Sequence, residues 1–519
     1  MNRRLLLLLL IALGALAFRL PRLDQRPLHN DEAINAFKLQ TLWEKGQYAY
    51  DPDEYHGPAL YYFSLPFLWL GPAQDAAQMK DATLRLTPVF FGVALILLLP
   101  LLRDGLGWGV ILSAGVLTAI SPAMVFYSRY FIHEMLFVFF TLLLLAAIWR
   151  YSQSSRLGWA ILGGAALGLM YATKETFVLN VAAALAALFA ARLVARCREG
   201  QPLRPPAGWV SGRHLLVAAL AALVVAELFF SSFGTNARGP VDALRTYLPW
   251  LKRAGGHSPH IHPWYFYFEH LFWFQAPKGP RWSEGLILVL ALVGSVVPFL
   301  RTSLPGVHTF LARSLVFYTW FLAAIYSVIS YKTPWCLLGF LQPMILVAGL
   351  GVVALFTWTR GFRLKLLLSL LLLGGGTHLG WQACCANFQF AATWRNPYVY
   401  AQTVPDIYRL VEKVAGIAKV HPQGNRMLIK VISNESYWPL PWYLRHFSQV
   451  GWWDALPADP YAPVIIVNSR FQAYLDEKSN KKYLMVGHYE LRPTVFLEMY
   501  VELDLWTKYV ATLPKEREE

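Results

Sequence analysis

Long apolar segments recur along the chain up to about residue 383 and then stop. A helix needs about 20 apolar residues to cross a bilayer, so this pattern predicts a bundle of membrane-spanning helices. Several segments are shorter than that, and we expect those helices to be tilted or only partly submerged. Eleven spans are predicted, at residues 4–18, 84–102, 108–124, 132–149, 158–173, 176–195, 214–232, 284–300, 314–330, 336–357 and 364–383.

The charges between these segments are unevenly distributed. One set of alternate connections is rich in arginine and holds only two acidic residues, Asp104 and Glu199. Basic loops face the cytoplasm in membrane proteins. The N-terminus is therefore predicted inside, and the loops 19–83 and 233–283 outside, the cytoplasmic (inner) membrane. The basic residues of the predicted cytoplasmic segments are Arg3, Arg4, Arg103, Arg150, Arg156, Arg192, Arg196, Arg198, Arg204, Arg213, Arg301, Arg313, Arg360, Arg363 and Lys365.

The first apolar segment also fits a second interpretation. Arg3 and Arg4, the apolar run that follows them and the small residues around Ala15 and Ala17 are typical of a cleavable signal peptide as well. Cleavage would leave the predicted sides of the later helices unchanged, because residue 19 is external in either case.

Residues 384–519 show a different pattern, with more charge and short alternating apolar runs. Strands that alternate with helices predict a small α/β domain. An odd number of spans places this domain outside the membrane, where we expect it to dock on the bundle. The predicted helices are residues 406–420 and 471–478, and the predicted strands are residues 427–433, 464–469 and 482–488.

The composition agrees with a membrane protein. Of 519 residues, 56% are hydrophobic and only 15% are charged, against about 25% charged in soluble domains. The excess of 46 Lys+Arg over 31 Asp+Glu gives a net charge of +15, which here indicates cytoplasmic loops and no nucleic-acid partner. The predicted fold is mostly α: a polytopic bundle over residues 1–383, followed by an external α/β domain over residues 384–519.

The first external loop carries two adjacent carboxylates, Asp31 and Glu32, shortly after the first span. In one interpretation, Asn30 caps a helix and both carboxylates stabilise its N-terminal end. In the other, a carboxylate acts as a general base or as a cation ligand at the membrane face. The two interpretations are compatible, because a carboxylate at the start of a helix is well oriented.

Further along the same loop, residues 58–70 form an apolar segment that contains Pro66 and is bounded by Gly-Pro pairs. We expect a helix at the membrane interface here, because another span would invert every later loop and break the charge pattern. His56 precedes this helix; a single external histidine is more often a surface residue.

Three more charged clusters lie at predicted external span ends, at residues 128–134, 173–176 and 331–335. Charges at membrane depth are costly and tend to be functional, although snorkelling or a local salt bridge would explain each cluster alone. All three lie on the same side as Asp31, so together they predict a site for a lipid phosphate and an acceptor. The residues predicted to bind substrate are His56, Arg129, Glu134, Lys174, Glu175 and Lys332.

The loop at residues 233–283 is long and rich in aromatic residues, and it contains His257, His260 and His262. Clustered histidines can bind a metal, but these lie in a Gly/Pro-rich stretch without helical spacing. We favour an aromatic loop at the membrane interface that covers a substrate.

Together these residues resemble the GT-C superfamily of membrane glycosyltransferases. The Asp31-Glu32 loop, His56-Gly57-Pro58 and Arg85 are similar to the branch of the protein O-mannosyltransferases and the lipid A aminoarabinose transferases (glycosyltransferase family 39-like). More narrowly, nearly the whole chain resembles the "flippase activity-associated" subfamily of prokaryotic membrane proteins. The strings that carry this likeness are Asp31-Glu32, Thr173-Lys174-Glu175, Tyr331-Lys332-Thr333-Pro334-Trp335 and Trp438-Pro439-Leu440-Pro441-Trp442-Tyr443-Leu444-Arg445.

The resemblance implies a transferase that moves a sugar from a polyprenyl-phosphate-linked donor to a protein, glycan or lipid acceptor on the external face. In such families the first-loop aspartate is a base or a metal-associated carboxylate, which carries over to Asp31 with Glu32 beside it, so a divalent metal is compatible with the site. Basic residues hold the donor phosphate, which by position suggests Arg129, Lys174 and Lys332. Direct displacement would invert the anomeric centre.

Two other functions stay open at this point. The chain could be a non-catalytic component, or a transporter, in the flipping of lipid-linked sugars, or a cell-envelope scaffold whose C-terminal domain binds partners. The absence of an internal sequence repeat of the transporter kind favours the transferase modestly.

Overall fold

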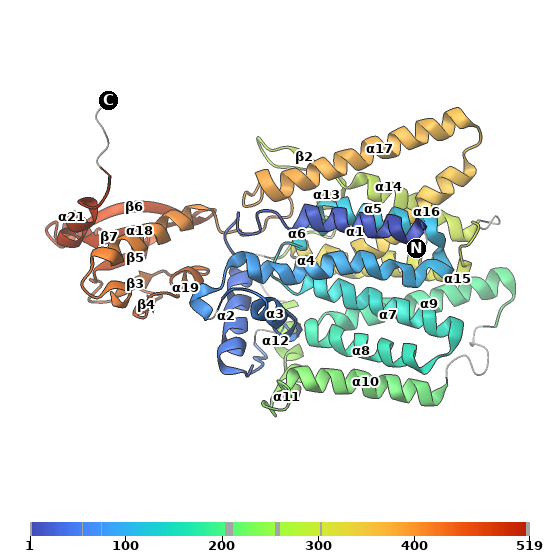
Figure 1. The fold of residues 1–519 in the computed structure, drawn as a ribbon, viewed down its shortest axis with the longest axis horizontal. Helices are drawn as coiled ribbons and strands as arrows, with labels where there is room; N and C mark the ends of the chain where they lie inside the picture. The colour runs from blue at the N-terminus through green and yellow to red at the C-terminus, as the bar shows by residue number, and fades with distance from the viewer. Residues whose placement is uncertain are drawn as a thin grey trace.

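The structure, a computed structural model, describes residues 3–53, 56–73, 75–202, 211–254, 260–300 and 304–514. Long helices lie side by side in a bundle, and a smaller sheet domain sits at one end of it (Figure 1). The long helices coincide with the predicted apolar segments. They are α1 (Arg3–Arg19), α4 (Asp81–Leu98), α5 (Arg103–Ile120), α7 (Glu134–Ser154), α8 (Leu157–Thr173), α9 (Phe177–Glu199), α10 (Gly212–Phe230), α14 (Gly285–Val296), α15 (Thr309–Val328), α16 (Leu338–Trp358) and α17 (Phe362–Cys384).

By length and composition alone, seven helical segments in the described residues could cross a membrane. One of them, Asp81–Ile120, unites α4, the short turn η2 (Leu99–Leu102) and α5. Two more apolar helices, Leu157–Thr173 and Gly285–Phe299, are shorter. The fold class is therefore the predicted helical membrane bundle. The predicted cytoplasmic residues Arg204 and Arg301 lie outside the described residues.

Small residues let the helices approach closely. Where α14 meets α16, a Cβ atom on Gly294 would lie 1.9 Å from the carbonyl oxygen of Val347, and one on Gly351 would lie 2.0 Å from that of Leu290. No side chain fits at either place, so these glycines set the distance between the two helix axes. Such contacts are typical of membrane helices, which pack by close backbone approach.

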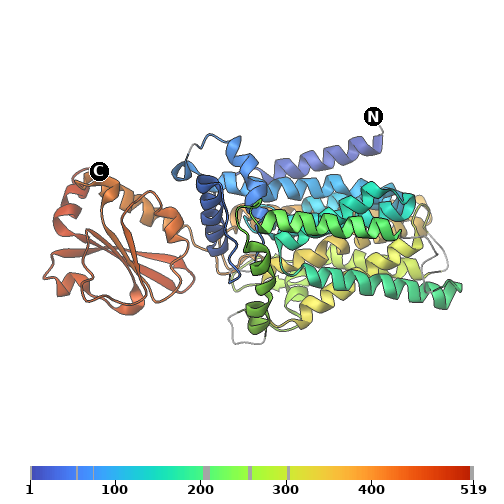
Figure 2. The same ribbon diagram turned by 90° about the horizontal axis from the view of Figure 1, so that it is seen from below.

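Shorter helices gather at one end of the bundle. α2 (Asn30–Lys45) runs across that end, between the bundle and the sheet domain, in both views (Figures 1 and 2). The predicted helix at residues 58–70 is present as α3 (Ala59–Trp69); its place at a membrane interface stays a prediction. The other short helices used below are α11 (Gly239–Arg245), α12 (Tyr247–Ala254) and α13 (Phe266–Phe272).

The C-terminal domain is a five-stranded sheet in the order β4-β3-β5-β7-β6. β3 pairs in parallel with β4 and β5, and β7 pairs antiparallel with β5 and β6. Its elements are α18 (Asp406–Val420), β3 (Ile429–Ile432), α19 (Leu440–Tyr443), β4 (Val450–Trp453), β5 (Val464–Asn468), α20 (Leu475–Lys478), β6 (Tyr483–Arg492), β7 (Val495–Glu502) and α21 (Leu503–Val510). The predicted helix at residues 406–420 and the three predicted strands are present. The helix predicted at residues 471–478 is shorter, as α20, and the sequence analysis missed α19, β4, β7 and α21.

Candidate functional site

The start of α2 places the two adjacent carboxylates. The backbone N–H of Asp31 donates to Nδ1 of His29 (3.1 Å), and the N–H of His29 donates to Oε2 of Glu32 (3.0 Å). The prediction that Asn30 caps this helix is therefore wrong, because the imidazole one residue earlier accepts from the helix N–H. Burial lowers the pKa of His29, which keeps the ring neutral and Nδ1 able to accept. Histidine is not a usual capping residue, so the sequence offered no sign of this.

Glu32 points into the protein and is fully buried. Its carboxylate accepts from Nε and Nη2 of Arg85, both at 2.8 Å, and from the N–H of Phe131 at 2.8 Å. Burial by itself would raise the pKa of Glu32, but the charges of Arg85 and Arg26 and these hydrogen bonds lower it to about 2. Glu32 therefore anchors α2 to α4.

Asp31, the neighbouring carboxylate, points elsewhere, since adjacent helix positions differ by about 100°. Its side chain is 41% exposed and faces a cavity of about 130 Å³ at the end of the bundle nearest the sheet domain. The structure thus brings Asp31 together with three of the predicted substrate residues. The cavity is lined by Asp31, His56, Lys174, Glu175, Thr176, Leu179, Trp250, Tyr326, Ile329, Tyr331, Thr333, Trp335 and Cys336.

His56 is held in a fixed orientation beside Asp31. Its Nδ1 lies 3.0 Å from Oε2 of Glu175, which is buried. Burial would raise the pKa of Glu175, but His56 and the charge of Lys174 lower it. An ionised carboxylate only accepts, so Nδ1 of His56 carries the proton of this bond.

The backbone of the first loop fixes this pair. The N–H of Gly57 donates to the carbonyl of Thr173 (3.1 Å), and His56 forms a β-bridge with Lys174. A Cβ atom on Gly57 would lie 2.1 Å from the carbonyl oxygen of Ala172. Only glycine permits this contact, so Gly57 is required for the loop to meet the end of α8.

Lys174 supplies a positive charge in the cavity wall. Its ammonium forms an ion pair with Glu134, and both side chains are 6% exposed. Sγ of Cys336 lies 3.7 Å from the same nitrogen. The predicted cluster at the start of the fourth span thus meets the predicted cluster between the fifth and sixth spans.

Arg129 and Lys332 are not among the residues that line this cavity. The guanidinium of Arg129 donates to the carbonyl oxygens of Arg19 (2.8 Å), Pro21 (2.8 Å) and Arg22 (3.1 Å), and it covers the ring of Phe388. These bonds hold the beginning of the first external loop.

The ammonium of Lys332 also forms hydrogen bonds within the protein. Its ammonium donates to the carbonyl oxygens of Ile329 (2.5 Å) and His262 (3.0 Å), and it ties the loop before α13 to the end of α15. In the structure, Arg129 and Lys332 hold loop backbone in place through hydrogen bonds to carbonyl oxygens. Phosphate binding by either residue stays a prediction.

Two histidines of the 233–283 loop that the sequence analysis named are described, and both lie beside one tyrosine. His257 lies outside the described residues, and His260 and His262 both approach the hydroxyl of Tyr400, at 2.6 and 3.4 Å. Throughout the described part of the chain, no three His, Cys, Asp or Glu side chains are grouped so that they could hold a metal ion. Asp31 and Glu175 are the two carboxylates among the described residues that line the cavity.

The string Trp438–Arg445, which entered only through a resemblance, connects the sheet domain to this end of the bundle. Nε1 of Trp442 and the hydroxyl of Tyr443 donate to the two carboxylate oxygens of Asp81, at 2.9 and 2.7 Å. The Tyr443 hydroxyl also accepts from the N–H of Leu28 (2.8 Å), which lies just before the cap of α2. The sheet domain therefore helps to hold the loop that carries Asp31.

Several cavity residues were not among the predicted site residues. Tyr331, Trp335 and Cys336 line the cavity beside Lys174, and the first two stand in a string that the sequence analysis quoted for another residue, Lys332. Trp250 comes from α12 in the aromatic loop. The signal for these residues was the density of aromatic side chains at a predicted external span end.

Part of the chain matches a known protein family. Residues 79–203 match the family model described as dolichyl-phosphate-mannose-protein mannosyltransferase. A comparison with curated proteins gave no match. The match covers about a quarter of the chain, and it is to the branch that the sequence resembles.

Two solved structures show the same fold at low sequence identity. ArnT from Cupriavidus metallidurans bound to undecaprenyl phosphate is 13% identical, with a TM-score of 0.61 over 94% of this chain and 97% of that one. The oligosaccharyltransferase of Archaeoglobus fulgidus, tethered with an acceptor peptide, is 14% identical, with a TM-score of 0.55 over 92% of this chain and 68% of that one. These likenesses extend over both the helix bundle and the sheet domain of this chain.

Proposed function

We propose that this chain transfers a sugar from a polyprenyl-phosphate-linked donor to an acceptor at the external face of the cytoplasmic membrane. The observation that supports this most directly is the cavity in which the exposed carboxylate of Asp31 lies with Lys174 and with the His56–Glu175 pair. ArnT, which shares the fold, binds undecaprenyl phosphate. A donor on a lipid carrier is also what the external face requires, because nucleotide-activated sugars stay in the cytoplasm.

The side chains divide the reaction between them. Asp31 takes the proton of an acceptor hydroxyl, and the oxygen of that hydroxyl bonds to the anomeric carbon of the sugar. The bond from that carbon to the phosphate oxygen breaks, and the polyprenyl phosphate leaves with the electron pair. The charge that develops on the phosphate needs a cation, and Lys174 is the buried cation in the cavity wall. A single displacement inverts the anomeric centre.

The direct test uses the purified protein in vesicles with a labelled polyprenyl-phosphate sugar. We expect label to pass to an added acceptor, with equal release of polyprenyl phosphate. A protein that binds the donor and changes its side of the membrane, but releases no polyprenyl phosphate with any acceptor, would support the flipping function instead.

The ion pair of Lys174 and Glu134 allows a prediction about donor binding. Lys174→Met alone leaves a buried carboxylate without its partner and is expected to destabilise the protein. Lys174→Met with Glu134→Leu removes both charges, so this double variant is expected to fold. We expect it to bind the donor lipid about ten- to a hundredfold more weakly, because one charge-assisted contact contributes roughly 1.5–3 kcal/mol.

Donor affinity is measured by titration of the lipid into the double variant and the wild type. The conservative pair Lys174→Arg with Glu134→Asp keeps both charges and serves as the control for packing changes. Wild-type affinity in the charge-free double variant would show that Lys174 is only a structural partner of Glu134.

The orientation of the bundle gives a further prediction. The helix α2, which carries Asp31, and the sheet domain lie at the same end of the bundle (Figures 1 and 2), and the basic loops predict that this end is external. In a variant without its four cysteines, single cysteines placed at Asp31 and at Asn480 should both react with an impermeant thiol reagent in intact cells. Reaction of both only after lysis would reverse the topology.

A further inference from the structure

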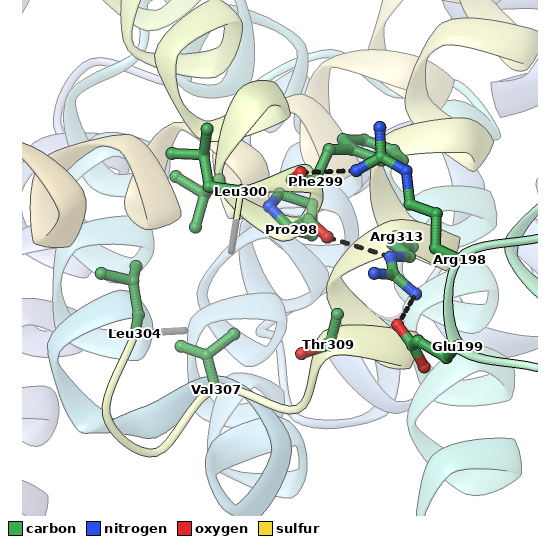
Figure 3. A pocket seen from close by; sticks show the side chains of 10 residues that line it. Arg198, Glu199, Pro298, Phe299, Leu300, Leu304, Val307, Thr309 and Arg313 are labelled. Carbon is green, nitrogen blue, oxygen red and sulfur yellow. Dashed lines mark hydrogen bonds and ion pairs between the residues drawn. The ribbon is translucent and has the colours of Figure 1, made fainter. Parts of the chain in front are cut away.

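A second and larger cavity, of about 620 Å³, lies at the other end of the bundle. It forms where α9 ends, where the turn η3 (Val297–Phe299) follows α14, and where α15 begins (Figure 3). α9 starts beside Lys174 and runs for 23 residues, so this cavity is about 33 Å away from the Asp31 cavity along the helix. The proposed transfer reaction makes no use of it.

Two arginines stand on one side of this cavity. Nη1 of Arg198 donates to the carbonyl oxygen of Phe299 (2.6 Å), and Nε of Arg313 donates to that of Pro298 (2.9 Å). Both guanidinium groups also lie within about 6 Å of the Phe299 ring, at 5.9 and 6.0 Å from its centroid. The end of η3 therefore fixes two positive groups around one aromatic side chain.

The charges on this side do not cancel. Among the described lining residues Glu199 is the one that is acidic, and it accepts from Nη1 of Arg313 at 2.6 Å. Its charge compensates one guanidinium, which leaves the charge of Arg198 in excess among the lining residues. Each guanidinium has five N–H donors in a planar arrangement. Nε and Nη2 of Arg198, and Nη2 of Arg313, form no hydrogen bond with the described protein atoms.

Aliphatic side chains are described on the other side of the cavity. Leu300, Leu304 and Val307 face the arginines across it (Figure 3). A cavity with cationic donors on one side and aliphatic side chains on the other fits an amphiphile with an anionic polar group. Arginine matches phosphate geometry better than any other side chain. The cavity also lies at the arginine-rich end of the bundle, the depth at which anionic lipid headgroups meet basic residues.

We infer that this cavity binds the phosphate group of an anionic membrane lipid. Arg198 contacts the phosphate oxygens, Arg313 adds one donor while it stays paired with Glu199, and the leucine and valine side chains contact the apolar part of the lipid. The shared ligand chemistry is a lipid phosphate, from either an anionic phospholipid or a polyprenyl phosphate. This binding site does not depend on the proposed transfer reaction.

The test measures lipid binding to the full-length protein by native mass spectrometry and by thermal stabilisation. The probes are phosphatidylglycerol, polyprenyl phosphate, phosphatidylcholine and inorganic phosphate. We expect Arg198→Ala to weaken binding of phosphatidylglycerol, polyprenyl phosphate or both by about tenfold or more, which corresponds to about 1.4 kcal/mol. Arg198→Lys should recover part of this, because lysine keeps the charge but not the bidentate contact.

The matched control is Arg196→Ala. It removes the same charge from an exposed position in the same helical turn, and Arg196 is not among the lining residues. Polyprenyl phosphate can also occupy the Asp31 cavity, so only the part of its binding that depends on Arg198 counts. Equal loss in both alanine variants, equal binding of phosphatidylcholine, or equal stabilisation by inorganic phosphate would overturn the inference.

Discussion

Replacing Asp31 with asparagine is expected to lower turnover by about 10²–10⁴-fold while donor affinity changes little. The change keeps the shape of the side chain and removes its ability to take a proton. The hydrogen bond that caps α2 comes from the backbone N–H of residue 31, which asparagine keeps, so α2 should start at the same place. The measurement is steady-state transfer from a polyprenyl-phosphate sugar, with donor binding determined separately.

Asp24→Asn is the matched control for this experiment. Asp24 is an exposed carboxylate in the same loop, and it is not among the residues that line the Asp31 cavity. We expect it to retain wild-type turnover. If Asp31→Asn also does so, Asp31 has no part in the chemistry, and the flipping or scaffold function becomes the better account of the chain.

The positions of the long helices were predictable because they depend on local sequence. An apolar run such as that of α9 or α16 leaves the backbone few choices in a lipid environment, since every N–H and C=O must be satisfied within the segment. β4 was missed because Val450–Trp453 is a short edge strand that contains a glycine and is only half-buried. Such a strand is defined by its pairing with β3 and not by its own pattern.

The candidate site was predictable in outline only. Charge alternation placed Asp31, His56, Lys174 and Glu175 at one end of the bundle, and the structure brings them into one cavity. The sequence could not show which charged side chains form hydrogen bonds within the protein and are therefore not available to a ligand. Arg129 looked free for a phosphate, yet three backbone carbonyls of the first loop surround its guanidinium.

The same limit applies to the two adjacent carboxylates. In the sequence, Asp31 and Glu32 are equivalent candidates for catalysis. In the structure, Glu32 is buried against Arg85, a residue 53 positions later in the chain, and Asp31 faces the cavity. A catalytic role for Glu32 stays a prediction. Its contacts indicate that it is a positioning residue, which fixes the helix that carries Asp31.

Breaking the Glu32–Arg85 pair is expected to have the largest effect on stability. Both side chains are buried, at 0% and 1% exposure. Glu32→Gln leaves the guanidinium of Arg85 buried without a counter-charge, and removal of one partner of such a pair typically costs about 3–5 kcal/mol. Glu32→Leu with Arg85→Met removes both charges and should be more stable than either single variant. Thermal unfolding in detergent measures the difference, and Glu44→Gln, an exposed change in the same helix, should leave it unchanged.

The pH dependence separates this charge effect from loss of packing. Glu32 has a pKa of about 2 in the folded protein, against an ordinary value of 4.5. A carboxylate with a lowered pKa stabilises the fold fully above its unfolded value, and that stabilisation is lost as the pH falls from 4.5 towards 2. The wild type should therefore lose stability more steeply over this range than the charge-free double variant. Parallel pH profiles for the two proteins would mean that the pair contributes through shape alone, and that Asp31 is held in place by the His29 cap and by the contact of Tyr443 with Leu28.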